Sequence, residues 1–113
     1  MGLQAYAGHL SHVEDLETRT AEARSAADLI QQALAAVKEA GLRAAVVSGG
    51  STGTIFIDPG LDALDEMQCG SYGFMDVEYD IVDLDGRSST PFEPALFVRT
   101  SVISKKCSRY RDC

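Results

Sequence analysis

The chain has 113 residues, of which 45% are hydrophobic and 24% are charged, so it allows one ordinary globular domain and argues against a wholly disordered chain. Its 17 acidic and 10 basic side chains give a net charge of −7, which disfavours nucleic acid and membranes as partners because phosphate contacts need clustered lysine and arginine. Three cysteines without a repeated spacing, no leader-like start and no apolar run near the ~20 residues that span a bilayer predict a cytoplasmic protein.

The first predicted elements are a short strand over residues 3–8 and a long helix over residues 11–40. Ser11 and Glu14 have the S-x-x-E spacing of a capping box, in which each side chain satisfies a backbone N–H at a helix start. Gly41 supplies the left-handed residue that commonly ends a helix. These three residues predict the two ends of the helix.

The predicted helix carries one stripe of small or apolar side chains, spaced three or four residues apart. The stripe consists of Val13, Leu16, Thr20, Ala23, Ala27, Ile30, Leu34, Val37 and Gly41. A coiled coil would use the same spacing, but alanine and threonine are small for coiled-coil knobs, which favours packing against a sheet. A break near residues 18–20 is a further alternative, because β-branched residues lose rotamer freedom in a helix.

The rest of the chain alternates strands with loops. Residues 43–47 form an apolar run without alternation, as expected of a parallel strand buried on both faces, and residues 66–69 predict a second short strand. Residues 95–104 are rich in β-branched and aromatic side chains and predict an edge strand or the first strand of another domain. The order of strand, helix, strand, loop and strand predicts βαβ units of an α/β fold.

A glycine-rich segment with the sequence SGGSTGT, here named the 48–54 turn, follows the predicted buried strand. Such a segment directs several backbone N–H groups and hydroxyls to one place, which suits a phosphate group. It lacks the Gly-Lys-Ser/Thr of a P-loop, and Gly50-x-x-Gly53 lacks the first glycine of a dinucleotide fingerprint. The alternative is a flexible turn without a ligand.

Tyr6, His9 and His12 lie around the end of the first predicted strand. The carboxyl-terminal edge of a parallel sheet is where ligands bind in α/β folds. At the first helical position, His12 would feel the positive end of the helix dipole, which favours a neutral imidazole that can accept a proton. The alternative is that both histidines are surface loop residues.

The sequence predicts no metal site. The acidic residues between positions 76 and 85 do not fit a calcium loop, because Ile81 and Phe92 would occupy ligand positions. Cys107 and Cys113 have no neighbouring histidine, which argues against zinc. A solvated acidic face explains the carboxylates better.

Four motifs together give the chain a family resemblance. They are residues 2–6 with Gly8 and His12, residues 47–54, residues 68–79 and residues 94–96, in matching order and spacing. With these motifs the chain resembles the D-threonine aldolase and D-serine dehydratase family of pyridoxal-phosphate enzymes, and it resembles the aldolase branch more. The resemblance covers nearly all of the chain to about residue 105.

The resemblance implies a fold and its division into domains. Members of this family have an alanine-racemase-type (β/α)8 barrel followed by a β-domain. Residues 1–90 would then be the carboxyl-terminal portion of a pyridoxal-phosphate-binding barrel, and residues 91–105 would be the start of the β-domain. Residues 106–113 do not resemble the family and would be an atypical basic tail.

The resemblance also implies roles for single residues. The cofactor-binding residues would be Tyr6, Ser48, Gly49, Gly50, Ser51, Thr52, Gly53 and Tyr72, with the 48–54 turn and Tyr72 at the phosphate and Tyr6 near the ring. The catalytic residues would be His12 and Tyr6, with His12 taking the proton from the β-hydroxyl of a D-3-hydroxy amino acid such as D-threonine. The products would be glycine and an aldehyde, and in the full-length family a divalent metal helps to bind the hydroxyl.

Two departures from the family limit this expectation. The family's Schiff-base lysine stands on an early strand, whereas the first lysine here is Lys38, within the predicted helix. The family's metal ligands form a His-x-Asp or His-x-Cys pair, and the chain has neither. We therefore expect a fragment of a lyase that is inactive alone, from a full-length protein that is a homodimer or monomer. The alternatives are a D-serine dehydratase-like fragment and a truncated, non-catalytic module that binds phosphate or a partner chain.

Overall fold

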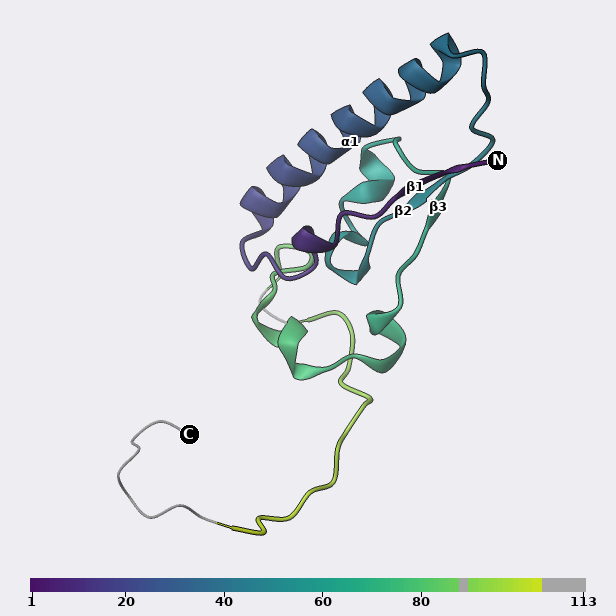
Figure 1. The fold of residues 1–113 in the computed structure, drawn as a ribbon. Coiled ribbons are helices and arrows are strands. Elements are labelled where there is room, and N and C mark those ends of the chain that lie inside the picture. Colours follow the sequence, from purple (N-terminus) through teal and green to yellow (C-terminus); the bar gives the residue numbers. More distant parts are fainter. Residues whose placement is uncertain (88–89, 105–113) are drawn as a thin grey trace.

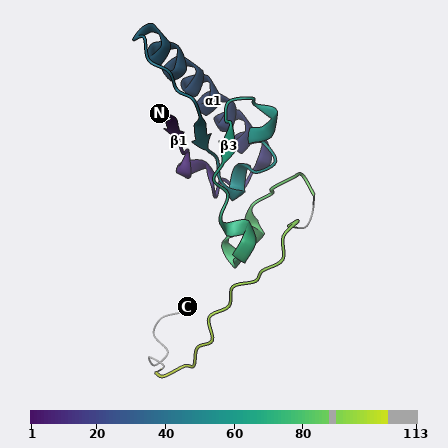
Figure 2. The same ribbon diagram turned by 90° about the vertical axis from the view of Figure 1, so that its right-hand side faces the viewer.

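A computed structural model describes residues 1–87 and 90–104 of the chain (Figure 1). Its strands are β1 (Leu3–Ala5), β2 (Val47–Gly49) and β3 (Glu66–Met67), and its one α-helix within these residues is α1 (Leu16–Glu39). The strands form a parallel sheet in the order β1-β2-β3. Figures 1 and 2 show α1 running along the sheet, with its carboxyl end near the chain's amino terminus. The predicted α/β class is confirmed in this form.

Five short 3₁₀ helices shape the connections. They are η1 (Gly8–Leu10), η2 (Thr52–Thr54), η3 (Asp58–Gly60), η4 (Ser71–Phe74) and η5 (Val77–Ile81). η1 follows β1, η2 and η3 connect β2 to β3, and η4 and η5 follow β3. The connection from β2 to β3 therefore contains no α-helix.

The central strand is buried on both faces, as predicted, but it begins at Val47 instead of residue 43. All three of its residues are buried. Residues just before it still pair, since Leu3 N donates to Val46 O (2.8 Å) and Ala45 N donates to Met1 O (2.9 Å). Gly49 allows a close approach to β1, because a Cβ there would lie 2.2 Å from Ala5 O.

The predicted start of the helix is wrong. Asp15 is the N-cap, and its carboxylate accepts a hydrogen bond from Thr18 N (2.7 Å). Ser11 instead ends η1, with its backbone N–H bonded to Gly8 O (3.2 Å), and its buried hydroxyl has no hydrogen-bond partner. The helix then runs unbroken through residues 18–20 and ends as predicted, with Gly41 at φ +72°.

The middle of the predicted stripe is buried, and most of its other residues are partly buried. Ala23 forms a core cluster with Leu10 of η1 and Ile57, and Ala27 on the same face is buried as well. The small alanines let α1 approach the sheet and its loops closely. The stripe therefore packs within the chain, against η1 and the loops beside the sheet.

A second core cluster lies beyond the sheet, and one arginine connects it to the start of α1. The cluster consists of Met75, Tyr79, Val82 and Leu84, with Phe92 packed against it. The guanidinium of Arg19 is fully buried and donates to the backbone oxygens of Val13, Glu14 and Asp83. Asp83 N in turn donates to Glu14 O (3.0 Å). Arg19 thus ties the approach to α1 to the segment after η5.

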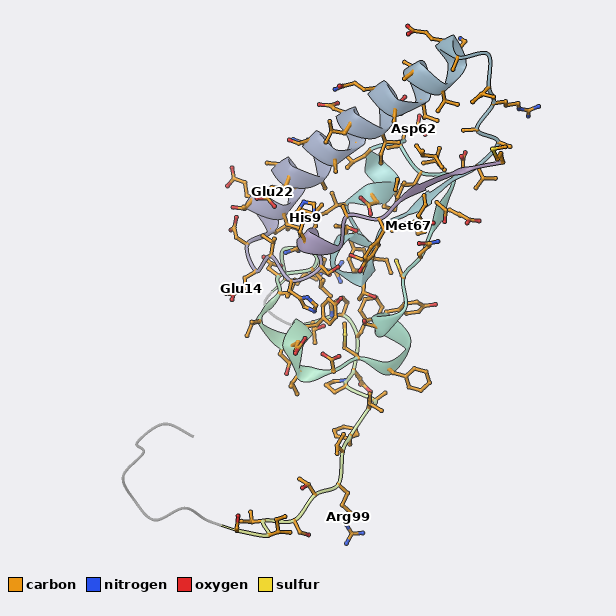
Figure 3. The ribbon with its side chains drawn as sticks, in the orientation of Figure 1. His9, Glu14, Glu22, Asp62, Met67 and Arg99 are labelled. Carbon is orange, nitrogen blue, oxygen red and sulfur yellow. The ribbon has the colours of Figure 1, made fainter. Side chains whose placement is uncertain are left out.

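The strand predicted over residues 95–104 does not form. One isolated bridge joins Met75 to Pro94, and the side chains beyond it are exposed, with Phe97 at 79% and Val98 at 85%. The segment extends away from the sheet and carries Arg99 at a distance from it (Figures 1 and 3). Strand propensity reflects packing on a pleated surface, and no described element offers residues 95–104 such a surface. Within residues 1–87 and 90–104, no helix is long and apolar enough to cross a membrane.

Candidate active site

The carboxyl ends of the three strands bring the predicted residues to one edge of the sheet. β1 leads to Tyr6 and His12, β2 leads into the 48–54 turn, and β3 leads to Tyr72. Because the strands are parallel, these segments leave the sheet at the same end. At Gly53 an added Cβ would lie 2.2 Å from Ser11 O, so the turn touches the backbone next to His12 directly.

The 48–54 turn is closed by its own polar groups. Gly50 has φ +72°, a conformation that glycine adopts without strain, and it turns the chain after β2. Ser51 N then donates to Thr54 Oγ1 (3.1 Å), and Thr54 N donates to Ser51 O (3.2 Å). Residues 51–54 are buried. The turn is therefore closed by its own hydrogen bonds and packed inside the molecule.

Tyr72 reaches the turn through its backbone. Its N–H donates to Thr52 Oγ1 (3.1 Å), which joins the segment after β3 to the turn after β2. The Tyr72 side chain is half exposed, and its ring centroid lies 5.8 Å from that of Phe92. Cys69 also contacts the turn, since its thiol donates to Ser51 O (3.2 Å), and burial raises its pKa.

The edge fits an anion but offers no lysine. The hydroxyls of Ser48 and Ser11 are buried without a hydrogen-bond partner, and hydroxyls in this state are costly unless a ligand or water satisfies them. With the glycine-rich turn, these groups fit the phosphate of a cofactor. Lys38 is the one lysine within the described residues, and it lies in the last turn of α1, at the opposite end of the sheet (Figure 1). The covalent attachment used by the family does not fit these residues.

His12 lies in the turn between η1 and α1, three residues before the N-cap Asp15. The prediction that it occupies the first helical position is therefore wrong, because the helix begins later. Its Nε2 lies 3.6 Å from Glu78 Oε2, and its side chain is half exposed. Its ring packs against Tyr79, with centroids 4.8 Å apart and planes at 42°.

Tyr79 is a site residue that the sequence interpretation missed. It is 4% exposed, and burial raises the pKa of its phenol, although a hydrogen bond to Ser71 opposes that change. The ionised forms of Tyr6, Asp76 and Cys69 add to the upward shift in the pKa of Tyr79. Tyr79 therefore remains neutral near neutral pH beside His12. Its position within the motif at residues 68–79 was the available signal, but nothing in the spacing paired it with a histidine 67 positions earlier.

Tyr6 lies at the end of β1 and is more than half exposed. Its ring lies over Gly8, where an added Cβ would come within 2.7 Å of Tyr6 Cε1. His9 of η1 is exposed and has no ion pair or ring contact among the described residues (Figure 3). Of the two histidines, His12 alone joins the site.

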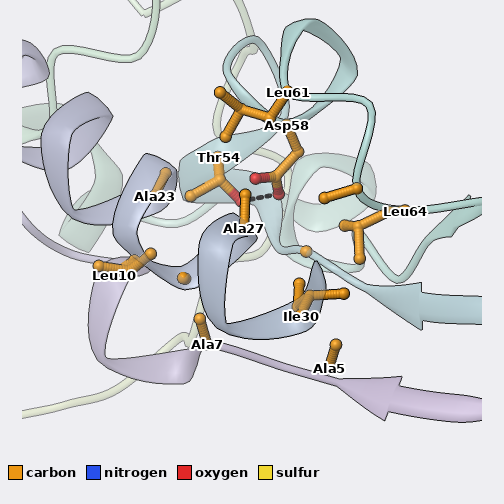
Figure 4. Close-up of a pocket in the computed structure, with 13 residues that line it drawn as sticks. Ala5, Ala7, Leu10, Ala23, Ala27, Ile30, Thr54, Asp58, Leu61 and Leu64 are labelled. Atoms are coloured by element: carbon orange, nitrogen blue, oxygen red, sulfur yellow. Dashed lines mark hydrogen bonds between the residues drawn. The ribbon is translucent and has the colours of Figure 1, made fainter. Parts of the chain in front are cut away.

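A partly buried carboxylate lies behind the turn. Asp58 Oδ2 accepts a hydrogen bond from Thr54 Oγ1 (2.5 Å), and burial raises the pKa of this carboxyl. The two side chains border a cavity of about 20 Å³ between α1 and the loops, with Ala23, Ala27 and Leu64 also in its wall (Figure 4). The sequence interpretation did not single out Asp58.

No group of three or more histidine, cysteine, aspartate or glutamate side chains in residues 1–87 and 90–104 is arranged to hold a metal ion. The arguments about Cys107, Cys113 and the basic tail concern positions outside the described residues.

Comparison with known proteins identifies several that are similar to this chain. No protein-family model matches it. It is 39% identical over 106 residues to a 3-hydroxy-D-aspartate aldolase of Paracoccus denitrificans (strain Pd 1222), covering 91% of this chain and 27% of that protein. It is 36% identical over 104 residues to a D-threonine aldolase of an Arthrobacter species, covering 92% of this chain and 27% of that protein.

A solved structure agrees with these relatives. The crystal structure of D-threonine aldolase from Filomicrobium marinum superposes with a TM-score of 0.72 at 37% identity, over 88% of this chain and 28% of that one. The chain spans about a quarter of the length of the proteins it matches. It is therefore homologous to a segment of the D-threonine aldolases and 3-hydroxy-D-aspartate aldolases, which confirms the family resemblance of its motifs.

Proposed function

We propose that this chain supplies the phosphate-binding turn and the acid–base histidine of a pyridoxal-phosphate-dependent aldolase that cleaves D-3-hydroxy amino acids such as D-threonine. One observation carries the proposal: the backbone contact of Gly53 with Ser11 keeps the 48–54 turn and His12 on one edge of the sheet. The names of the relatives support the same reaction class.

The sheet and α1 are, in this proposal, part of a (β/α)8 barrel. Three consecutive parallel strands lie side by side in chain order, as in a barrel, without the reversal of order found in doubly wound sheets. The substrate edge of a barrel is the carboxyl end of its strands, which is the edge described above. Residues 1–90 then belong to the barrel and residues 91–105 begin the β-domain.

The turn would bind the phosphate through backbone N–H groups and the hydroxyls of Ser48 and Ser51, and the Thr52 hydroxyl would hold Tyr72 beside it. Tyr6, exposed at the end of β1, would line the cofactor ring. When bound, pyridoxal phosphate supplies an electron sink for the negative charge left on the substrate's α-carbon.

His12 would take the proton from the β-hydroxyl as the carbon–carbon bond breaks, which leaves glycine and an aldehyde. The Glu78 carboxylate lies 3.6 Å from Nε2 and would help to orient the imidazole. Tyr79 would hold the imidazole ring of His12 by packing against it. Its own phenol stays neutral, since its pKa is raised.

A second candidate is a non-catalytic module that binds phosphate-bearing ligands. The position of Lys38 at the far end of the sheet favours it, because no described lysine is near the turn. Under both candidates this chain alone neither binds the cofactor covalently nor cleaves substrate. Borohydride reduction in the presence of pyridoxal phosphate should leave the mass of the chain unchanged, and glycine should not form from D-threonine. A reduced adduct with turnover would contradict this expectation.

Binding at the turn is tested with isotope-labelled chain and pyridoxal phosphate. We expect the amide signals of residues 49–54 to shift and their hydrogen exchange to slow with the phosphate ester, whereas pyridoxal without phosphate leaves them unchanged. No change at millimolar pyridoxal phosphate would overturn the proposed site.

A further inference from the structure

The 48–54 turn is supported from behind by a short chain of hydrogen bonds. Ser51 N donates to Thr54 Oγ1 (3.1 Å), and that hydroxyl donates its own proton to Asp58 Oδ2 (2.5 Å). Because a hydroxyl has one proton, its bond to the carboxylate fixes the lone pairs of Oγ1 toward Ser51. Thr54 is 3% exposed, so water does not compete for this hydroxyl.

The backbone leaves space for the carboxylate only because residue 50 is glycine. A Cβ on Gly50 would lie 2.7 Å from Asp58 Oδ2. The turn, the threonine hydroxyl and the carboxylate are therefore packed against one another. Asp58 itself lies outside the turn, in η3. It borders the cavity between α1 and the loops (Figure 4).

We infer that Asp58 is a positioning residue for the phosphate-binding turn, acting through the Thr54 hydroxyl and its bond from Ser51 N to hold the backbone of residues 51–54 in its closed conformation. This inference rests on the proposed function of the turn. Asp58 does not touch the ligand in this role. It sets the geometry of the groups that do.

The titration of Asp58 offers a signature that a purely structural side chain would lack. Burial raises the pKa of its carboxyl above the ordinary 3.8, while the hydrogen bond from Thr54 opposes the change. The other titratable group coupled to it among the described residues is Cys69, whose own pKa lies higher. The residues of α1 that border the cavity, including Ala23, Ala27 and Ile30, carry no charge. Protonation of Asp58 weakens the hydrogen bond that it accepts from Thr54 Oγ1. The amide signal of Ser51, which donates to the same hydroxyl, should therefore change as Asp58 titrates.

The first measurement uses the unliganded chain. We expect the Ser51 and Thr54 amide signals to titrate together with a midpoint above 3.8 in the wild type, and the titration to vanish in Asp58→Asn. Asp62→Asn is the matched control, because Asp62 is exposed and has the left-handed backbone (φ 50°) that asparagine also adopts. A flat wild-type titration would overturn the inference without any variant having to fold.

The second measurement is the dissociation constant for pyridoxal phosphate. Asp58→Ala should weaken binding about tenfold through loss of one charge-assisted hydrogen bond, whereas Asp58→Asn, which still accepts from Thr54, stays within about threefold of the wild type. Unchanged binding by a folded Asp58→Ala variant would overturn the inference and leave the proposed site standing. No binding by the wild type would overturn the proposed site and the inference together.

Discussion

Some single residues in this chain make stabilising contacts that cannot be predicted from their positions in the sequence. Arg19 lies beside the predicted stripe of α1 and is not part of it, yet its guanidinium is fully buried. Its acceptors are backbone oxygens up to 64 positions away. A buried cation with backbone partners holds distant segments together, because leaving either side unpaired is costly.

We expect Arg19→Ala to lower the free energy of unfolding by about 3 kcal/mol, since it removes three hydrogen bonds to backbone oxygens and leaves a cavity. Urea denaturation followed by circular dichroism measures the loss. Arg24→Ala, an exposed arginine on the same helix, is the control and should change the stability little. Equal effects of the two substitutions would show that burial of Arg19 contributes nothing.

The sequence predicted the two ends of α1 unequally, and the reason is physical. Gly41 was identified because a left-handed residue at a helix end requires glycine or asparagine, a local property. Ser11 and Asp15 both fit an N-cap by type, and the choice between them is decided by Arg19 and Asp83, which hold the backbone of Val13 and Glu14 out of the helix. Such long-range contacts produce no periodic pattern in the sequence. Asp58 was missed for a different reason: its partner Thr54 is only four residues away, but the contact depends on the loop geometry of η2 and η3 and not on a periodic pattern.

The N-cap assignment gives a prediction with a defined pH dependence. The hydrogen bonds from Thr18 lower the pKa of Asp15, so the carboxylate stabilises the folded state above its ordinary pKa of 3.8 and this contribution is lost as pH falls through the folded value. Asp15→Ala should lower the thermal midpoint at neutral pH and have no effect in strong acid. Thermal melts across this range test it. Glu17→Ala, in the first turn of the helix, is the comparison and should not reproduce the pattern.

The contact between two elements, the 48–54 turn and the segment before His12, can be tested by substitution of Gly53. Gly53→Ala places a methyl group 2.2 Å from Ser11 O and should cost about 2 kcal/mol of stability while shifting the His12 ring signals. Gly73→Ala is the matched control, because a Cβ at Gly73 has no neighbour within 4 Å among the described residues. If both variants behave alike, the turn does not contact the backbone of Ser11 next to His12.

On the scale of the whole molecule, the described residues form an open sheet and not a closed barrel. β1 and β3 each have one edge with no strand partner among residues 1–87 and 90–104. The extended segment beyond Pro94 exposes Val98 and Ile103 almost fully. Unpaired strand edges and exposed apolar side chains both favour association with another polypeptide.

We therefore expect the isolated chain to self-associate with increasing concentration, as sedimentation velocity would detect. Val98→Asp should reduce the association because it places a charge in the apolar segment. Ser101→Asp adds the same charge at a polar position nearby and should reduce it less. A chain that stays monomeric at every concentration would contradict this view of the open edges.

The glycine contact beside His12 has a consequence for how such a site can vary. Main chain meets main chain there, with no side chain between the two loops. The distance between the backbone at Ser11 and the 48–54 turn is therefore set by the main chain, whichever side chains surround it. In the proposed aldolase, substitutions of those surrounding side chains would alter the shape and polarity of the site, and hence the choice of reactant, without moving the two backbones apart.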